Sequence, residues 1–189
     1  FGSKTGVEVT GELRGRIQPD KRCSTCLASL AIGYSIDTTQ IQMVKAYAII
    51  ANGGNNVYPK LIKTSNEDTQ EAEVVIDKEL ADELKMLLIN VVNGERGTAR
   101  SIKKEGLVIG GKTGTSKSFI EDQNYAEKKY NTSFTGFFET PDGPIVGSVI
   151  LWHAINSQYS EYVTGGSTAA PIFGELVESI VKRNILDGK

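Results

Sequence analysis

The chain has 189 residues, of which 39% are hydrophobic and 23% charged, with a formal net charge of −2. These values suit a single globular domain, or a large part of one. The near-neutral charge offers no basic stripe, so we expect no nucleic-acid binding. No apolar run reaches the roughly 20 residues that span a bilayer, and no signal peptide is visible. Because the first residue is Phe1 rather than Met, we expect a processed chain or a piece of a larger protein.

Two helices are predicted in the first half of the chain. Residues 1–22 are rich in glycine and charged residues and favour loops with short extended pieces. Residues 37–39 (Asp-Thr-Thr) suit an N-cap, and apolar residues at helical spacing follow until Asn-Gly-Gly at 52–54. The second helix is predicted from Asp77 to Asn93, with leucines along one side. Both helices are expected to pack on a core.

From Leu107 onward the sequence favours strands. Residues 132–139 and 145–152 are β-prone, and the turn residues Pro-Asp-Gly between them predict an antiparallel hairpin. The polar stretch 116–131 is expected to be a long loop and the best candidate for disorder. An amphipathic helix from about residue 168 to 186 ends the chain. These elements predict an α+β fold, an antiparallel sheet flanked by helices.

The two cysteines, Cys23 and Cys26, have the spacing of half a zinc site or of a redox pair. Zinc needs about four ligands, and the single histidine, His153, lies far along the chain. No thioredoxin-like pattern surrounds the pair. We therefore expect two ordinary thiols or an incidental local disulfide, and neither a metal nor a cofactor.

The most informative segment is residues 110–116 (Gly-Gly-Lys-Thr-Gly-Thr-Ser), which follows an apolar run at 107–109. We expect it at the edge of a strand, where the glycines leave bare backbone for a ligand to touch. Side chains alternate along a strand, so Thr113 and Thr115 share one face, and Lys112 adds a fixed positive charge. One cation beside two hydroxyls is a good receptor for a carboxylate.

Lys-Thr-Gly is also one of three short motifs of penicillin-recognising serine enzymes, the others being Ser-x-x-Lys and Ser-x-Asn. A second Lys-Thr-Gly, at residues 4–6, has no strand leading into it. Ser-x-x-Lys occurs at Ser101 and at Ser179, but a nucleophilic serine needs a buried, partly neutral lysine, and both pairs have solvated surroundings. Ser-x-Asn is absent. The residues alone therefore predict a carboxylate site without a nucleophile.

The whole chain carries further landmarks in a fixed order. They include Phe-Gly-x-Lys-Thr-Gly at 1–6, Ala-Asn-Gly-Gly at 51–54, Gly-Thr-Ala at 97–99, Phe-Thr-Gly-Phe at 134–137 and Gly-Gly-x-x-Ala-Ala-Pro-x-Phe at 165–173. With these landmarks the chain resembles the carboxy-terminal half of the transpeptidase domain of class B penicillin-binding proteins, closest to the septal, cell-division type. The resemblance implies the serine β-lactamase and penicillin-binding transpeptidase fold. Residues 1–189 would be its C-terminal portion, with the nucleophile-bearing part upstream.

The resemblance implies a peptidoglycan D,D-transpeptidase on the periplasmic or extracytoplasmic face of the cytoplasmic membrane, anchored by a helix that precedes this chain. A serine in the upstream part would attack the D-Ala–D-Ala bond of a stem peptide, and β-lactams would acylate the same serine. The expected partners of the whole protein are stem peptides, β-lactam antibiotics and other proteins of cell division and cell-wall synthesis.

The resemblance also implies roles for individual residues. Lys112 and Thr115 would be catalytic, because the lysine sets the electrostatics of the site and the Thr115 backbone N–H supplies half of an oxyanion hole. The hydroxyls of Thr113 and Thr115 would bind the terminal carboxylate, and Gly114 would keep the strand edge clear. Two tyrosines resemble aromatic residues that line the pocket: Tyr130 and Tyr162.

Two other interpretations stay open. The fold is also that of non-catalytic β-lactam-sensing modules and of serine β-lactamases, which need a deacylating water held by a base. Without an upstream serine, the isolated chain is expected to be inactive. It is also expected to leave apolar surface uncovered, which favours self-association or cover by an upstream segment.

Overall fold

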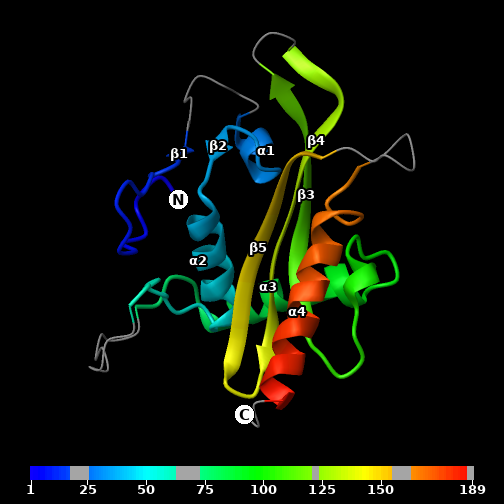
Figure 1. Ribbon diagram of the computed structural model, residues 1–189. Helices are drawn as coiled ribbons and strands as arrows, with labels where there is room; N and C mark the ends of the chain where they lie inside the picture. The colour runs from blue at the N-terminus through cyan, green and yellow to red at the C-terminus, as the bar shows by residue number, and fades with distance from the viewer. Residues whose placement is uncertain (18–25, 63–72, 121–123, 155–162, 187–189) are drawn as a thin grey trace.

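Three antiparallel strands form the sheet at the centre of the molecule (Figure 1). The computed structural model describes residues 1–17, 26–62, 73–120, 124–154 and 163–186. In the sheet, β3 (Ile109–Ile120) pairs with β4 (Asn124–Thr140), which pairs with β5 (Gly143–Ala154). The order β3-β4-β5 places β4 in the middle. The predicted hairpin is confirmed, because Thr140 lies opposite Gly143 across a two-residue turn.

The three predicted helices are present. In α2 (Gln40–Ala51), the Thr39 hydroxyl accepts from the Gln42 N–H at 3.3 Å, and the Gln42 side chain accepts from the Thr39 N–H at 3.0 Å. This reciprocal capping box explains why the helix begins there. Asp77 caps α3 (Lys78–Asn93) by accepting from the Leu80 N–H at 2.8 Å. The last helix is α4 (Ala169–Leu186).

Four short elements were not located individually from the sequence, because each is too short for a periodic pattern to show. They are β1 (Arg16–Ile17), α1 (Cys26–Ala31), β2 (Ile36–Asp37) and the 3₁₀ turn η1 (Arg100–Ile102). β1 pairs with β2 in a separate small sheet, which a contact of 2.9 Å between Arg16 Nε and Asp37 Oδ2 supports. The expectation of short extended pieces near the amino terminus is therefore confirmed.

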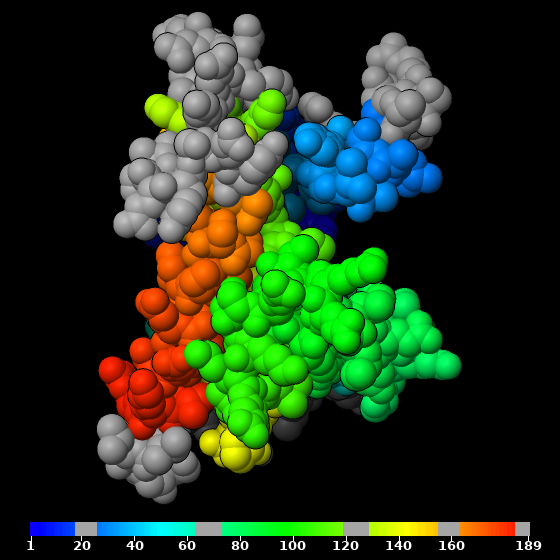
Figure 2. All heavy atoms as spheres, turned by 90° about the vertical axis from the view of Figure 1, so that its right-hand side faces the viewer, coloured from blue at the N-terminus to red at the C-terminus, as the bar shows by residue number. Residues whose placement is uncertain are grey.

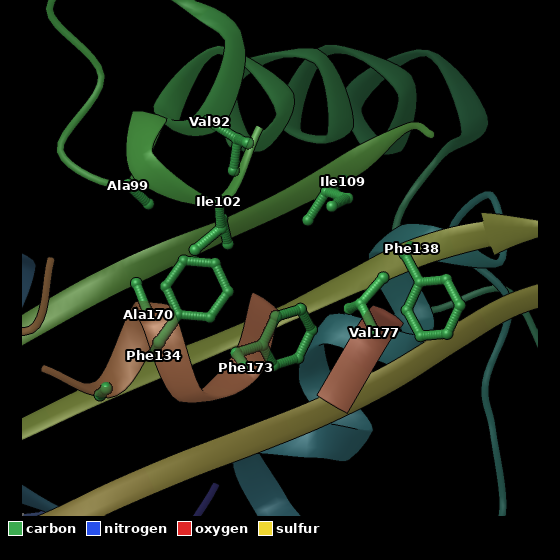
Figure 3. Packing of buried hydrophobic residues seen from close by; sticks show 10 residues of the cluster. Val92, Ala99, Ile102, Ile109, Phe134, Phe138, Ala170, Phe173 and Val177 are labelled. Carbon is green, nitrogen blue, oxygen red and sulfur yellow. The ribbon is translucent and has the colours of Figure 1, made fainter. Parts of the chain in front are cut away.

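The main core lies between the sheet and α4 (Figure 3). Phe134 of β4 and Phe173 of α4 are buried, with ring centroids 4.8 Å apart at a tilt of 52°. Phe138 lies four residues further along β4 on the same face and joins the same cluster. The first residue of β3, Ile109, is also part of it. The packing therefore holds the beginning of β3 in the same core as α4.

The opposite face of β4 contacts α3. Phe137 points to this face, and the ammonium group of Lys85 on α3 lies 5.7 Å from its ring centroid. Lys85 also pairs with Glu139 of β4 at 2.6 Å. In Figure 1, α4 crosses in front of the sheet while α3 lies behind it. Helices on both faces confirm the expected α+β architecture.

The prediction of a long loop at residues 116–131 is wrong. β3 continues to Ile120 and β4 already begins at Asn124, and residues 121–123 lie outside the described residues. The polar composition of this stretch favoured a loop, because the sequence does not show which backbone groups it pairs with. In the structure the two strands satisfy one another's backbone groups, so the hairpin extends beyond the apolar core.

Both edges of the sheet are open within the described part of the chain, since β3 and β5 each pair only with β4. Large apolar side chains are exposed elsewhere, as expected for a chain that leaves apolar surface uncovered. The most exposed are Leu27, Ile32, Leu13 and Trp152, at 79%, 74%, 71% and 71%. Open edges and exposed apolar groups of this kind are surfaces on which further protein packs.

We expect the contact between α4 and β4 to dominate the stability of the chain. Phe173→Ala should lower the free energy of unfolding by about 3–5 kcal/mol, because it removes a buried ring and leaves a cavity. Leu176→Ala on the same helix is the control, since Leu176 is 50% exposed. Urea unfolding measures both, and similar losses for the two variants would contradict the assigned core.

Candidate functional site

The Lys-Thr-Gly-Thr segment lies near the middle of β3, just after the strand residue Ile109 that belongs to the core. The two glycines that precede it are buried. A Cβ at Gly110 would lie 2.6 Å from the ring of Phe137, and one at Gly111 would lie 2.5 Å from that of Phe134. The expectation that these glycines offer bare backbone to a ligand is therefore wrong. They are glycines because aromatic rings of β4 cover them.

Gly114 is crowded in another way. A Cβ there would lie 2.4 Å from the Ser133 hydroxyl oxygen, which belongs to a side chain that can rotate. The backbone at Gly114 is half-buried, and the role predicted for it, keeping the strand edge clear, stays a prediction.

Lys112 is exposed, and its Nζ donates to the Thr113 carbonyl oxygen at 3.0 Å. An ammonium group has three hydrogens, so two remain for a ligand. The Lys112 side chain and the Thr113 side chain point to opposite faces of β3, as alternation along a strand requires. The Lys112 ammonium group is thus held by the backbone of its own strand, next to the open edge of the sheet.

Thr113 and Thr115 share the other face, as predicted, and each hydroxyl has a partner outside β3. The Thr113 Oγ1 lies 2.9 Å from the Thr98 Oγ1, in the connection between α3 and β3. The Thr115 Oγ1 accepts a hydrogen bond from the Gly165 N–H at 3.0 Å. A hydroxyl that accepts keeps its own hydrogen. Thr115 and one member of the threonine pair can therefore each donate to an anion.

The segment at 165–166 approaches the site too closely for any side chain. A Cβ at Gly165 would lie 2.5 Å from the Ser133 carbonyl oxygen and 2.6 Å from that of Gly114. A Cβ at Gly166 would lie 2.1 Å from the Thr98 carbonyl oxygen. In Figure 2, the orange atoms that precede α4 lie against the green atoms of this region. The two glycines let the turn before α4 lie directly on the strand that carries the site.

The two tyrosines differ in what the structure describes. Tyr130 is half-buried on β4, opposite Lys117 of β3 and two residues from Thr115 on that strand. That position agrees with a place beside the site. Tyr162 lies outside the described residues.

The other Lys-Thr-Gly, at residues 4–6, has a structural role. The Glu12 carboxylate accepts from the Thr5 hydroxyl and the Thr5 N–H, both at 2.6 Å, and from the Gly6 N–H at 3.2 Å. The hydrogen bond from the Thr5 hydroxyl, followed by the one from its N–H, lowers the pKa of Glu12. The tripeptide is occupied in holding an amino-terminal loop.

In both Ser-x-x-Lys pairs the lysine contacts a carboxylate. Lys104, which follows Ser101, forms an ion pair with Glu178, and Lys182, which follows Ser179, lies 3.6 Å from the same carboxylate. The hydrogen bond and charge of Lys104 hold the pKa of Glu178 below its usual value. Both serines are exposed. Each lysine is thus engaged by a carboxylate rather than by its serine, so neither pair supplies an activated serine.

The remaining sequence signals concern metals, membranes and cysteines. Within the described ranges, no group of histidine, cysteine, aspartate and glutamate could hold a metal ion. No helix among the same residues is long and apolar enough to cross a membrane. Cys26 is disulfide-bonded, which agrees with a disulfide rather than ordinary thiols at the pair, while Cys23 lies outside the described residues.

The arrangement of sheet, helices and Lys-Thr-Gly-Thr strand is that of penicillin-binding transpeptidase domains. The transpeptidase domain of penicillin-binding protein 3 from Burkholderia pseudomallei superposes with a TM-score of 0.80 at 27% identity, over 97% of this chain and 54% of that one. Penicillin-binding protein 3 from Mycobacterium tuberculosis, solved in complex with ampicillin, gives 0.80 at 28%, over 97% and 43%.

Sequence comparison gives the same result. The family model "Penicillin binding protein transpeptidase domain" matches residues 1–178, and the chain belongs to this family. Stage V sporulation protein D of Bacillus subtilis is 31% identical over 94% of this chain and 28% of its own length. A probable peptidoglycan D,D-transpeptidase FtsI of Caulobacter vibrioides is 28% identical over 87% and 29%. The chain thus spans less than a third of the length of these class B relatives.

Sequence reasoning missed two parts of the site. Thr98 was recognised only as part of the Gly-Thr-Ala landmark, and Gly165 only as part of the Gly-Gly landmark. Their contacts with Thr113 and Thr115 span 15 and 50 residues. The landmarks were the available signal, since small residues at fixed places favour close backbone contact.

Gly165→Ala should destabilise the chain by about 1–3 kcal/mol, because its Cβ would overlap backbone oxygens that cannot rotate away. Gly147→Ala is the matched control, since a Cβ there meets only the edge of the Phe173 ring, at 3.2 Å. Neither glycine has a positive φ. Thermal unfolding should show the larger loss for Gly165→Ala, and the reverse order would contradict the close packing of this turn on β3.

Proposed function

We propose that this chain is the carboxy-terminal part of the transpeptidase domain of a peptidoglycan D,D-transpeptidase. The whole protein would cross-link stem peptides through a serine that precedes Phe1. The observation that carries the proposal is the pair of oriented hydroxyls on Thr113 and Thr115, on the strand where the Lys112 ammonium binds the Thr113 carbonyl oxygen, in a chain whose family match covers residues 1–178.

The substrate-binding step follows from this chemistry. The terminal carboxylate of a D-Ala–D-Ala peptide would accept hydrogen bonds from the Thr113 and Thr115 hydroxyls, and the Lys112 charge would attract it. Because Thr98 and the Gly165 N–H hold these hydroxyls from behind, little conformational freedom is lost when the ligand binds. Preorganised donors of this kind are also what an acyl-transfer transition state requires.

The chemical step would divide between this chain and the upstream part. The serine oxygen would attack the carbonyl carbon of the penultimate D-Ala, the C–N bond would break, and terminal D-Ala would leave with the serine proton. An amine of a neighbouring stem peptide would then attack the resulting ester and release the serine. Within the described residues β3 pairs on one side only, so alternate backbone N–H groups point to its open edge. The Thr115 N–H would stabilise the negative oxygen in both steps, a contribution of about 3 kcal/mol for one such donor.

The proposed location is the extracytoplasmic face of the cytoplasmic membrane, where stem peptides are. The disulfide at Cys26 supports it, because disulfides persist in oxidising compartments outside the cytoplasm. The membrane anchor and the contacts with other cell-division and cell-wall proteins would belong to the whole protein. β-Lactams would acylate the same serine, as the ampicillin complex of the M. tuberculosis relative suggests by analogy.

The full-length protein should be labelled by a fluorescent penicillin at a serine upstream of Phe1. The isolated 189-residue chain should form no covalent adduct, because neither of its Ser-x-x-Lys pairs supplies an activated serine. Peptide mapping after labelling locates the site, and intact-mass measurement tests the isolated chain. A full-length protein that resists labelling would contradict the enzyme proposal, and rapid steady turnover of nitrocefin would identify a β-lactamase instead.

Thr113→Val in the full-length protein should slow acylation by benzylpenicillin about tenfold, because the variant loses one hydrogen bond to the ligand carboxylate. Thr113→Ser keeps the hydroxyl and should stay within about threefold of wild type. The methyl ester of the same penicillin lacks the anion and should be affected much less by Thr113→Val. Equal losses for acid and ester would mean that Thr113 does not bind the carboxylate.

A further inference from the structure

The pairing of the strands becomes irregular close to Thr115, around Asn131 of β4; the residues that lie beside Asn131 across the sheet are called the bulged row below. The regular pairing of β3 with β4 runs through Thr115 and Thr132 and ends at Lys117, where the register shifts. On the other side of β4, the register with β5 shifts between Tyr130 and Thr132. Bulges are concentrated at functional sites because they turn the direction of a strand and its side chains.

The extra residue on β5 is visible in the pairing. Tyr130 lies opposite Ala154 and Thr132 opposite Leu151, so one residue of β4 faces two of β5. His153 in this bulge has a φ of +53°, which is rare for a residue other than glycine. Such a backbone persists only where the surroundings hold it.

Asn131 is the residue that holds it. Its Oδ1 accepts from the His153 N–H at 3.1 Å and from the Ser118 hydroxyl at 2.9 Å. One oxygen on β4 thus binds β5 on one side and β3 on the other. Ser118 is fully buried, so its hydroxyl needs this partner.

The bulged row lies where the acyl part of a bound ligand would be. If the carboxylate binds at Thr113 and Thr115 and the reacting carbonyl lies at the Thr115 N–H, the acyl part of the ligand must continue toward Lys117. Tyr130 lies directly opposite Lys117 and next to Asn131. The part of the molecule fixed by Asn131 is therefore the part that the acyl side chain of a substrate or β-lactam meets.

We propose that Asn131 is a positioning residue for recognition of the acyl side chain. It fixes the bulged row so that Tyr130 and the end of β3 stand beside the acyl part of the ligand. This inference rests on the proposed acyl-transfer function and goes beyond it, since it assigns a determinant of selectivity to a residue that does not itself touch the reacting atoms.

The test compares two probes on the full-length protein. Benzylpenicillin carries a bulky acyl side chain, whereas 6-aminopenicillanic acid has the same ring and carboxylate without one. Asn131→Ala should slow acylation by benzylpenicillin about tenfold, because small displacements of positioning groups cost one to two orders of magnitude in rate. Acylation by 6-aminopenicillanic acid should change by less than about twofold, since its carboxylate contacts remain.

Asn131→Asp is the matched control, because both hydrogen bonds use only Oδ1 as an acceptor and a carboxylate oxygen replaces it. This variant should keep the wild-type ratio of the two rates. Ser118→Ala removes one of the two hydrogen bonds and should give a smaller selective loss, which provides a second test if Asn131→Ala fails to fold.

The outcomes separate the two levels of the proposal. An equal loss for both probes, or no loss for either, would overturn the role of Asn131 while the acylated wild type still supports the transpeptidase function. A wild type that neither probe acylates would remove the proposed function and this inference with it. A selective loss that aspartate restores would establish the positioning role.

Discussion

The close contact between β3 and β4 at Gly110 and Gly111 is the constraint on which the rest of the site depends. The rings of Phe137 and Phe134 occupy the space above these glycines, and Phe134 continues into the core against Phe173 of α4. The strand is thereby anchored from one side, by β4 and the core. Its other edge carries no strand within the described residues, so the same packing that fixes β3 leaves a row of backbone and side-chain donors free for a ligand.

Anchoring the strand does not by itself orient its hydroxyls. That orientation comes from two segments far away in the sequence, Thr98 before β3 and the Gly165 turn before α4. Gly166 also packs on the Thr98 carbonyl, so the two segments brace each other as well as the strand. A substitution in either segment is therefore expected to act on both hydroxyls, which is why their effects on ligand binding are not expected to be additive.

The sequence predicted the features that local chemistry determines. The caps at Thr39 and Asp77 marked the helix starts, and Pro141-Asp142-Gly143 marked the hairpin, because each acts on its own neighbours. The sequence-based prediction failed where the local structure depends on a partner far away in the sequence. Residues 116–131 are polar and were predicted as a loop, yet each strand of the pair satisfies the backbone of the other. The same limit hid the contacts of Thr98 and Asn131, since a side-chain hydrogen bond across the fold leaves no periodic pattern in the sequence.

The site has a direction along β3. At one end, Lys112 and the braced threonines suit a small anion; at the other, the strand register shifts next to Asn131. A ligand with a carboxylate at one end and a variable group at the other can contact the two ends of this site independently. In the proposed function, recognition of the anion would tolerate little change, whereas the bulged end could change its shape without disturbing Thr113 or Thr115. Because a strand edge contacts only one side of such a ligand, the nucleophile of the proposed reaction would approach from the side that the described residues leave open.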